Sequence, residues 1–222
     1  CNEALLMEYL LGKTTDKKQR AYLINHFLDQ FKGTLYRQTM FAEFELQMGK
    51  MAESGEALTA DALSAKYLAL NKLYFGDMMI SDDEIALEWT RIPHFYYNYY
   101  VFQYATGYSA AIALSRKILA EGKPAVERYL GFLSGGCSKT PIDLLKGAGV
   151  DMTSPEPVNT ALELFGKLLE GGTSKVLQVD APYRFCLLRL RHDLAKLHLV
   201  AKWLFSISHY LCVLSIFSVT SN

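Results

Sequence analysis

Hydrophobic residues recur along most of the chain at steps of three to five residues, the spacing of amphipathic helices. The longest such pattern has apolar residues at positions 23, 27, 31, 35, 40, 44 and 48. Asp16 precedes it as a helix-capping residue and Ser54-Gly55 ends it. No alternating run rich in β-branched residues occurs before residue 171. The pattern therefore predicts an all-α, multi-helix fold.

Capping residues, glycine and proline set the boundaries of the other helices. Thr59, Thr140 and Ser154 suit helix N-caps, and the last two are followed by Pro. Pro93 interrupts the pattern between two helices. The predicted helices cover residues 2–11, 16–51, 60–75, 82–89, 97–120, 123–134, 140–147 and 154–170.

The pattern changes at Gly171-Gly172, which divides the chain into a helical body, 1–170, and a tail, 171–222. The tail ends in an apolar run, 203–219, that approaches the length of a membrane span. Serines and a histidine interrupt this run, so the pattern favours a packed or poorly ordered terminal segment over a membrane helix. The first residue already lies in a helical pattern, and we expect the chain to be a fragment of a longer protein.

Composition narrows the class of protein. Of the 222 residues, 50% are hydrophobic and 21% charged, which excludes a disordered chain. Lys and Arg together number 23, as do Asp and Glu, so there is no basic excess to indicate nucleic-acid binding. The four cysteines form no paired motif, which favours a reducing compartment over a disulfide framework.

The strongest candidate for chemistry is the aromatic stretch 92–108, which holds six of the fourteen tyrosines. On the predicted helix four of them share one face, and His94 lies one turn earlier; the four are Tyr97, Tyr100, Tyr104 and Tyr108. One interpretation is an aromatic core stripe. The other is a wall of phenol donors and an imidazole that binds a peptide carbonyl and stabilises a developing oxyanion. Tyr96, Tyr99 and Phe102 are expected to point elsewhere and serve the core.

Other polar groups give weaker signals. The loop Ser134-Gly135-Gly136-Cys137 lacks the spacing of a phosphate-binding loop and is expected to be a flexible connection. No base lies near Cys137 in the sequence, and His26 is expected at the surface. His192 and His198 are six residues apart, which does not suit a helical zinc pair. No motif in the chain predicts a metal site.

Several long stretches resemble one family, oligoendopeptidase F, within the thimet-oligopeptidase-like zinc metallopeptidases. The resemblance covers about residues 1–170. The matching stretches are residues 1–11, 37–45 (Arg-Gln-Thr-Met-Phe-Ala-Glu-Phe-Glu), 92–100 (Ile-Pro-His-Phe-Tyr-Tyr-Asn-Tyr-Tyr), 104–107, 132–136 and 148–157.

The resemblance implies a helical enzyme of the cytoplasm that cleaves short peptides in a channel, with one zinc ion held by His-Glu-x-x-His and a later Glu. It assigns substrate binding and oxyanion stabilisation to His94, Tyr97, Tyr100 and Tyr104. It adds further substrate contacts at Tyr99, Tyr108, Gly135 and Gly136, and it makes Glu3 a residue supporting the metal ligands.

His-Glu-x-x-His is absent from the 222 residues. Zinc is therefore expected in the parent enzyme, with its ligands in a preceding part, and the chain alone is expected to be inactive. Two alternatives stay open. The chain can be a noncatalytic helical module that binds peptides or partner helices, or a protein anchored in a membrane by residues 203–219.

Overall fold

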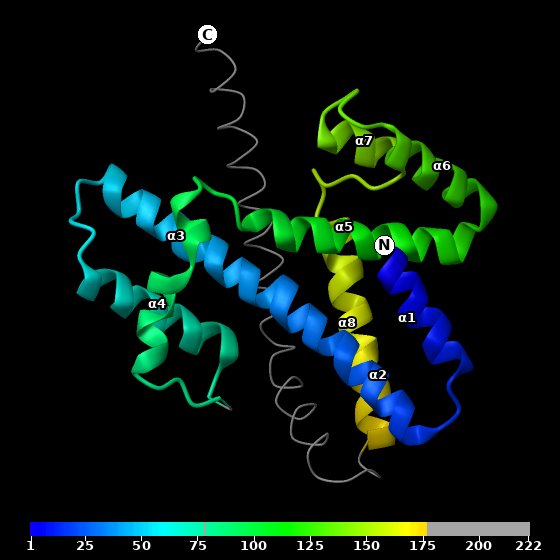
Figure 1. Ribbon diagram of the computed structural model, residues 1–222, viewed down its shortest axis with the longest axis horizontal. Helices are drawn as coiled ribbons and strands as arrows, with labels where there is room; N and C mark the ends of the chain where they lie inside the picture. The colour runs from blue at the N-terminus through cyan, green and yellow to red at the C-terminus, as the bar shows by residue number, and fades with distance from the viewer. Residues whose placement is uncertain (78, 177–222) are drawn as a thin grey trace.

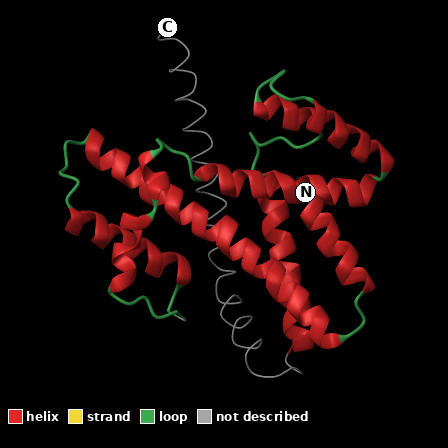
Figure 2. Cartoon of the chain, in the orientation of Figure 1, coloured by secondary structure: helices red, strands yellow, loops and turns green. Residues whose placement is uncertain are grey.

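The computed structural model describes residues 1–77 and 79–176, with side chains as far as residue 170 (Figure 1). All of its regular elements are helices (Figure 2), which confirms the all-α prediction for this part of the chain. They are α1 (Asn2–Lys13), α2 (Lys17–Gln30), η1 (Phe31–Tyr36), α3 (Arg37–Glu53), α4 (Ala60–Phe75), η2 (Glu84–Arg91), η3 (Pro93–Tyr96), α5 (Phe102–Glu121), α6 (Lys123–Ser134), α7 (Pro141–Gly147) and α8 (Glu156–Val176).

The predicted long helix is present as α2, η1 and α3, which follow one another as a single rod (Figure 1). Asp16 caps it, with its carboxylate accepting a hydrogen bond from the backbone N–H of Gln19 at 2.8 Å. The middle section, η1, is π-helical. Every residue from Thr39 to Leu46 is buried, so α3 is covered on all sides rather than amphipathic. This helix is the axis around which the other elements are placed.

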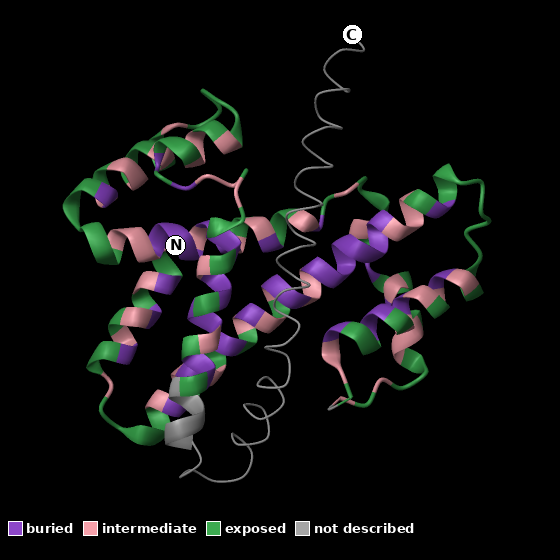
Figure 3. Cartoon of the chain, turned by 180° about the vertical axis from the view of Figure 1, so that it is seen from behind, coloured by how far each residue is buried: buried purple, intermediate pink, exposed green. Residues whose placement is uncertain are grey.

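The rest of the molecule packs on the two ends of this rod. At one end α4 packs against α3, and η2 packs against α4; at the other, α8 and α1 pack against α2. Helix α5 crosses α8, and α6 and α7 lie on its far side (Figure 1). Buried residues follow α3 and the inner faces of α5 and α8 (Figure 3), with the fully buried rings of Phe27, Phe31, Phe44 and Phe165 among the largest.

Most predicted boundaries are confirmed, including two N-caps. The hydroxyl of Thr59 accepts from Ala62 N–H, and that of Thr140 from Asp143 N–H, both at 3.2 Å. Helix α8 continues past the predicted end at residue 170 to Val176. None of the described helices combines the length and apolar character that a membrane span requires. The apolar run 203–219, His192 and His198 lie outside the described residues.

The predicted helix over residues 97–120 is wrong at its start, because α5 begins at Phe102. Asn98 and Tyr99 have left-handed backbone angles, with φ of 46° and 60°. A right-handed helix cannot pass through two such residues. Instead, a short 3₁₀ turn, η3, is followed by a non-helical connection over residues 97–101. The tyrosine spacing that predicted a single helix face therefore does not reflect a continuous helix.

Candidate substrate-binding site

His94, Tyr97, Tyr100 and Tyr104 come together as one group, here called the aromatic cluster. The ring of His94 lies 5.8 Å from that of Tyr97, 5.7 Å from Tyr100 and 6.1 Å from Tyr104, measured between centroids. Tyr100 lies 6.1 Å from Tyr97 and 5.8 Å from Tyr104. The imidazole is the hub of the group. The sequence thus predicted three of the four tyrosines grouped with His94 correctly, although Tyr97 and Tyr100 are not on the helix. The fourth, Tyr108, lies outside the cluster.

The aromatic cluster lies at the surface. Tyr97 is 58% exposed, Tyr100 41% and Tyr104 39%, so these tyrosines do not form a core stripe. The Nε2 atom of His94 is 3.4 Å from the hydroxyl of Tyr104. Desolvation and the neighbouring Tyr100 hydroxyl raise the pKa of Tyr104, which keeps its proton available for donation. The group offers three phenols and an imidazole to a ligand.

The other aromatic residues of this stretch divide differently from the prediction. Tyr99 and Phe102 pack partly buried against the core, as expected. Tyr96 is 78% exposed, which contradicts its predicted core role. Tyr96 is the last residue of the short turn η3, directly before the non-helical connection 97–101, and its side chain is left at the surface.

A stripe of four residues on α3 holds this whole stretch in place. Arg37, Phe41, Glu45 and Gly49 follow one another at steps of four residues, so they lie along one side of the helix. We call them the α3 stripe. Its members contact, in order, η2, η3 and the 97–101 connection. The chain from Glu88 to Tyr99 therefore runs along α3.

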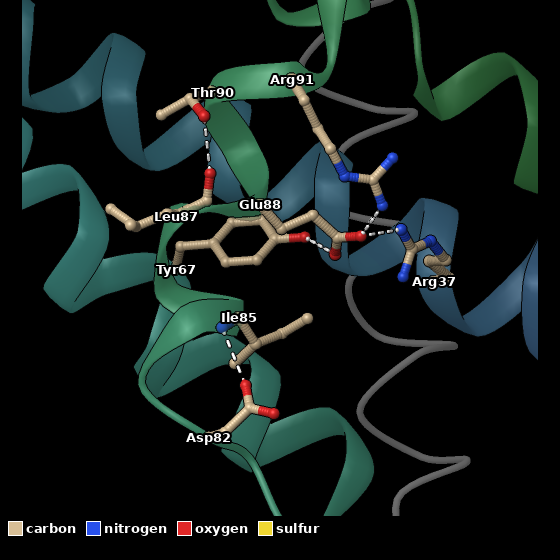
Figure 4. Close-up of polar contacts among 8 residues, drawn as sticks. All are labelled: Arg37, Tyr67, Asp82, Ile85, Leu87, Glu88, Thr90 and Arg91. Carbon is tan, nitrogen blue, oxygen red and sulfur yellow. Dashed lines mark hydrogen bonds and ion pairs between the residues drawn. The ribbon is translucent and has the colours of Figure 1, made fainter.

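The first contact of the α3 stripe is an ion pair with Glu88 (Figure 4). Arg37 Nη2 lies 2.6 Å from Oε1 of Glu88, and the Tyr67 hydroxyl donates to Oε2 at 2.7 Å. Arg91 also donates to Glu88. Burial alone would raise the pKa of Glu88, but the hydrogen bonds from Arg37, Tyr67 and Arg91 and the charge of Arg37 lower it. Glu88 is therefore ionised and fully paired.

The next contacts are aromatic and then polar. The Phe41 ring meets Phe95 of η3 edge to face at 5.5 Å, and the Arg37 guanidinium lies over the Phe41 ring, 4.7 Å from its centre. Glu45, only 6% exposed, accepts a hydrogen bond from the backbone N–H of Tyr99 at 2.5 Å. Burial raises the pKa of Glu45 to about 7, although this hydrogen bond opposes the shift.

The remaining residues implied by the resemblance lie apart from the aromatic cluster. Tyr108 points into the core, where its ring meets Phe31 edge to face at 5.1 Å. Gly135 and Gly136 follow α6, and no described hydrogen bond or ring contact joins them to the cluster. Glu3 lies on α1 and accepts from Gln30 Nε2 at 2.5 Å. Of the nine predicted site residues, the structure thus brings four together in the aromatic cluster. Four others lie apart from it, and the ninth, Tyr99, lies between the cluster and the core.

Within residues 1–77 and 79–176 no three His, Cys, Asp or Glu side chains lie close enough to hold a metal ion. His26 is exposed, as expected, and the described cysteines, Cys1 and Cys137, are both free. These residues therefore do not fit a zinc site.

Comparison with known proteins identifies the fold that carries this cluster. Residues 1–164 match peptidase family M3. The chain belongs to this family. The M3 chain is 62% identical over 169 residues to oligopeptidase PepF of Bacillus subtilis, and 44% identical over 168 residues to the chromosomal oligoendopeptidase F of Lactococcus lactis. The resemblance predicted from the sequence is thus confirmed.

A solved structure agrees with the sequence matches. The crystal structure of oligoendopeptidase F from Enterococcus faecium superposes on the M3 chain with a TM-score of 0.75 and 49% identity, over 77% of this chain and 33% of that one. The two sequence matches each cover 76% of this chain but 25% and 28% of the relatives. The M3 chain therefore spans about a quarter to a third of the length of these relatives.

Proposed function

We propose that this M3 chain is the part of an oligoendopeptidase that binds the substrate peptide and stabilises the charge that develops during cleavage. The observation that supports this role is the aromatic cluster, which is exposed and lies inside the segment matched to the family. The proposed substrates of the whole enzyme are short peptides, and the proposed compartment is the cytoplasm.

The chemistry follows from the side chains present. Each phenol donates one hydrogen bond, and the imidazole donates or accepts depending on its tautomer. Donors already directed at one place stabilise the tetrahedral oxyanion better than they bind a planar carbonyl, which lowers the barrier. The cluster rings already contact one another, so a ligand would meet donors that are mutually positioned.

Zinc in the whole enzyme would be held by residues other than those described here, because the described residues form no ligand set. The isolated 222-residue chain is therefore expected to bind short peptides without cleaving them. In isolation it would act as the noncatalytic peptide-binding module considered from the sequence. Calorimetric titration with a short peptide in the presence of a chelator measures that binding.

A chimera tests the enzymatic role. The 169-residue stretch of Bacillus subtilis PepF that aligns with this chain is replaced by the corresponding residues of the M3 chain. We expect the chimera to cleave a quenched fluorescent peptide. Changing the phenol that meets the oxyanion to Phe is expected to lower kcat about 10²–10³-fold, as for other oxyanion donors. Tyr97→Phe, Tyr100→Phe and Tyr104→Phe are made singly to find it.

Tyr9→Phe is the matched control, since Tyr9 is also exposed, at 61%, but lies on α1. An active chimera whose kcat and KM stay within twofold in all three cluster variants would overturn the proposed role. Peptide cleavage by the isolated 222-residue chain, abolished by a chelator, would refute the expectation that it is inactive alone.

A further inference from the structure

We propose that Glu45 and Gly49 of α3 are positioning residues that set the orientation of the aromatic cluster through the backbone and ring of Tyr99. The consequence for peptide binding rests on the proposed function. The structural part of the proposal does not, because it concerns only how residues 97–101 are held. Neither residue touches the ring groups of the cluster in the described contacts.

The backbone of the connection requires an anchor. Asn98 and Tyr99 both have left-handed angles, which are uncommon for residues other than glycine and persist where surrounding contacts hold them. The described anchor is the carboxylate of Glu45, which accepts from Tyr99 N–H at 2.5 Å. Tyr97 and Tyr100 lie on either side of these two residues in the chain. A change at the Tyr99 amide therefore turns two cluster rings at once.

Gly49 fixes the other end of the same residue. A Cβ atom placed on Gly49 would lie 2.1 Å from the Tyr99 hydroxyl oxygen and 3.3 Å from the ring carbon that bears it. The Tyr99 side chain thus fills the space that a larger residue at position 49 would need. Glu45 and Gly49 are one helical turn apart, so together they hold Tyr99 by its amide and by its ring tip.

A second buried carboxylate on α3 shows that burial of a glutamate there does not by itself involve the cluster. Glu43, 4% exposed, accepts from the Tyr74 hydroxyl at 2.7 Å and from Gln47 Nε2 at 3.2 Å. Its described contacts lie with α3 and α4, away from residues 97–101. Burial raises the pKa values of both glutamates, so Glu43 is a matched control in chemistry, depth and helix.

The test uses the full 222-residue chain and two measurements: hydrogen exchange at the Tyr99 amide by NMR, and the Kd of a short peptide by calorimetry. We expect Glu45→Leu to speed Tyr99 exchange at least tenfold and to raise Kd at least fivefold. Glu45→Gln retains an acceptor and is expected to keep both values within twofold of the unmodified chain. Gly49→Ala displaces the Tyr99 ring and is expected to raise Kd at least threefold.

Glu43→Leu is expected to lower thermal stability without changing Tyr99 exchange or Kd. Unchanged Tyr99 exchange in Glu45→Leu would overturn the proposal, and so would an opened amide with unchanged Kd. If Glu45→Leu does not fold, an unchanged Kd in folded Gly49→Ala overturns it instead. Absence of any peptide binding by the unmodified chain would count against the proposed function, while the exchange data would still decide whether Glu45 anchors Tyr99.

Discussion

The two stretches held by the α3 stripe are built in opposite ways. At η2, the carboxylate of Glu88 is buried and accepts from two arginines and a tyrosine (Figure 4). A few residues later, the aromatic cluster exposes its rings, and the Tyr104 hydroxyl lies within hydrogen-bond distance of His94. One stretch uses its polar groups to stabilise the fold, whereas the other leaves them accessible. The buried contacts of Glu88 hold η2 in place, and the chain that carries the aromatic cluster continues from there.

The largest effect is expected from breaking the paired stretch. Glu88→Ala leaves Arg37 and Tyr67 without their acceptor, and we expect the free energy of unfolding to fall by about 2–4 kcal/mol. Part of the full cost for a buried pair is relieved because the Arg37 and Arg91 side chains are 32% and 70% exposed and can be hydrated. Urea denaturation at neutral pH measures the change.

The pH dependence of this stability difference shows whether the ionised carboxylate of Glu88 is its cause. The pKa of Glu88 is lowered, so its stabilising contribution is present above the unfolded-state pKa of 4.5 and is lost as the pH falls through the folded-state pKa. The difference between the unmodified chain and Glu88→Ala should therefore shrink in acid. Glu84→Ala, at an exposed position of the same 3₁₀ helix, is the control and should change stability by less than about 0.5 kcal/mol. If Glu88→Ala lowered the free energy of unfolding no more than Glu84→Ala does, the contrast between the paired and the accessible stretch would be wrong.

Glu45 should show the opposite pH dependence. Its pKa rises from 4.5 to about 7 on folding, so its favourable contribution is present below pH 4.5 and is lost as the pH rises to about 7. Glu45→Gln carries no charge to desolvate. We expect this variant to match the unmodified chain at pH 4.5 and to be more stable by about 1–3 kcal/mol at pH 8. Urea denaturation at both pH values gives the difference, and equal stabilities at pH 8 would contradict the expected burial of charge.

The helices of this fold were predictable because their signals are local. Asp16, Thr59 and Thr140 cap helices in the structure as their positions in the sequence predicted. Most of the aromatic cluster was also predictable, since His94 and three tyrosines lie within eleven residues. The same spacing wrongly added Tyr108, whose ring packs against Phe31 instead. The path of the chain between them was not. Tyrosine spacing fits a helix face, but the left-handed angles at Asn98 and Tyr99 depend on tertiary contacts to α3.

The α3 stripe was missed for a similar reason. Its four-residue spacing was visible in the predicted helix, and two glutamates in an otherwise apolar run, Phe41-Ala-Glu-Phe-Glu45, were a signal of buried polar partners. The identity of those partners was not visible, because Glu88 lies 51 residues from Arg37 and Tyr99 lies 54 residues from Glu45. Sequence periodicity indicates which residues share a helix side but not which distant segment covers it.

The accessible stretch is expected to respond in binding rather than in stability. The double variant Tyr97→Phe and Tyr100→Phe removes two exposed hydroxyls, so the free energy of unfolding should change by less than about 0.5 kcal/mol. Loss of two hydrogen bonds to a peptide should raise Kd about 5–30-fold, on the basis of about 0.5–1 kcal/mol for each bond. Calorimetric titration and urea denaturation of the same samples separate the two effects. A fall in stability with unchanged Kd would show that these hydroxyls belong to the fold.

The smallest effect is expected at Tyr108, which lies on α5 one turn beyond Tyr104 but on the core side. Its hydroxyl is buried without a hydrogen-bond partner among the described residues, and burial together with the charge of Glu3 raises its pKa. Removing an unpaired buried hydroxyl relieves a desolvation cost, so Tyr108→Phe should leave stability unchanged or increase it by up to about 1 kcal/mol. Tyr67→Phe, which loses the hydrogen bond to Glu88, should instead cost about 1–2 kcal/mol and serves as the comparison. If Tyr108→Phe raised the peptide Kd as much as the change at Tyr97 and Tyr100, the boundary between the accessible cluster and the core would have to be moved to include it.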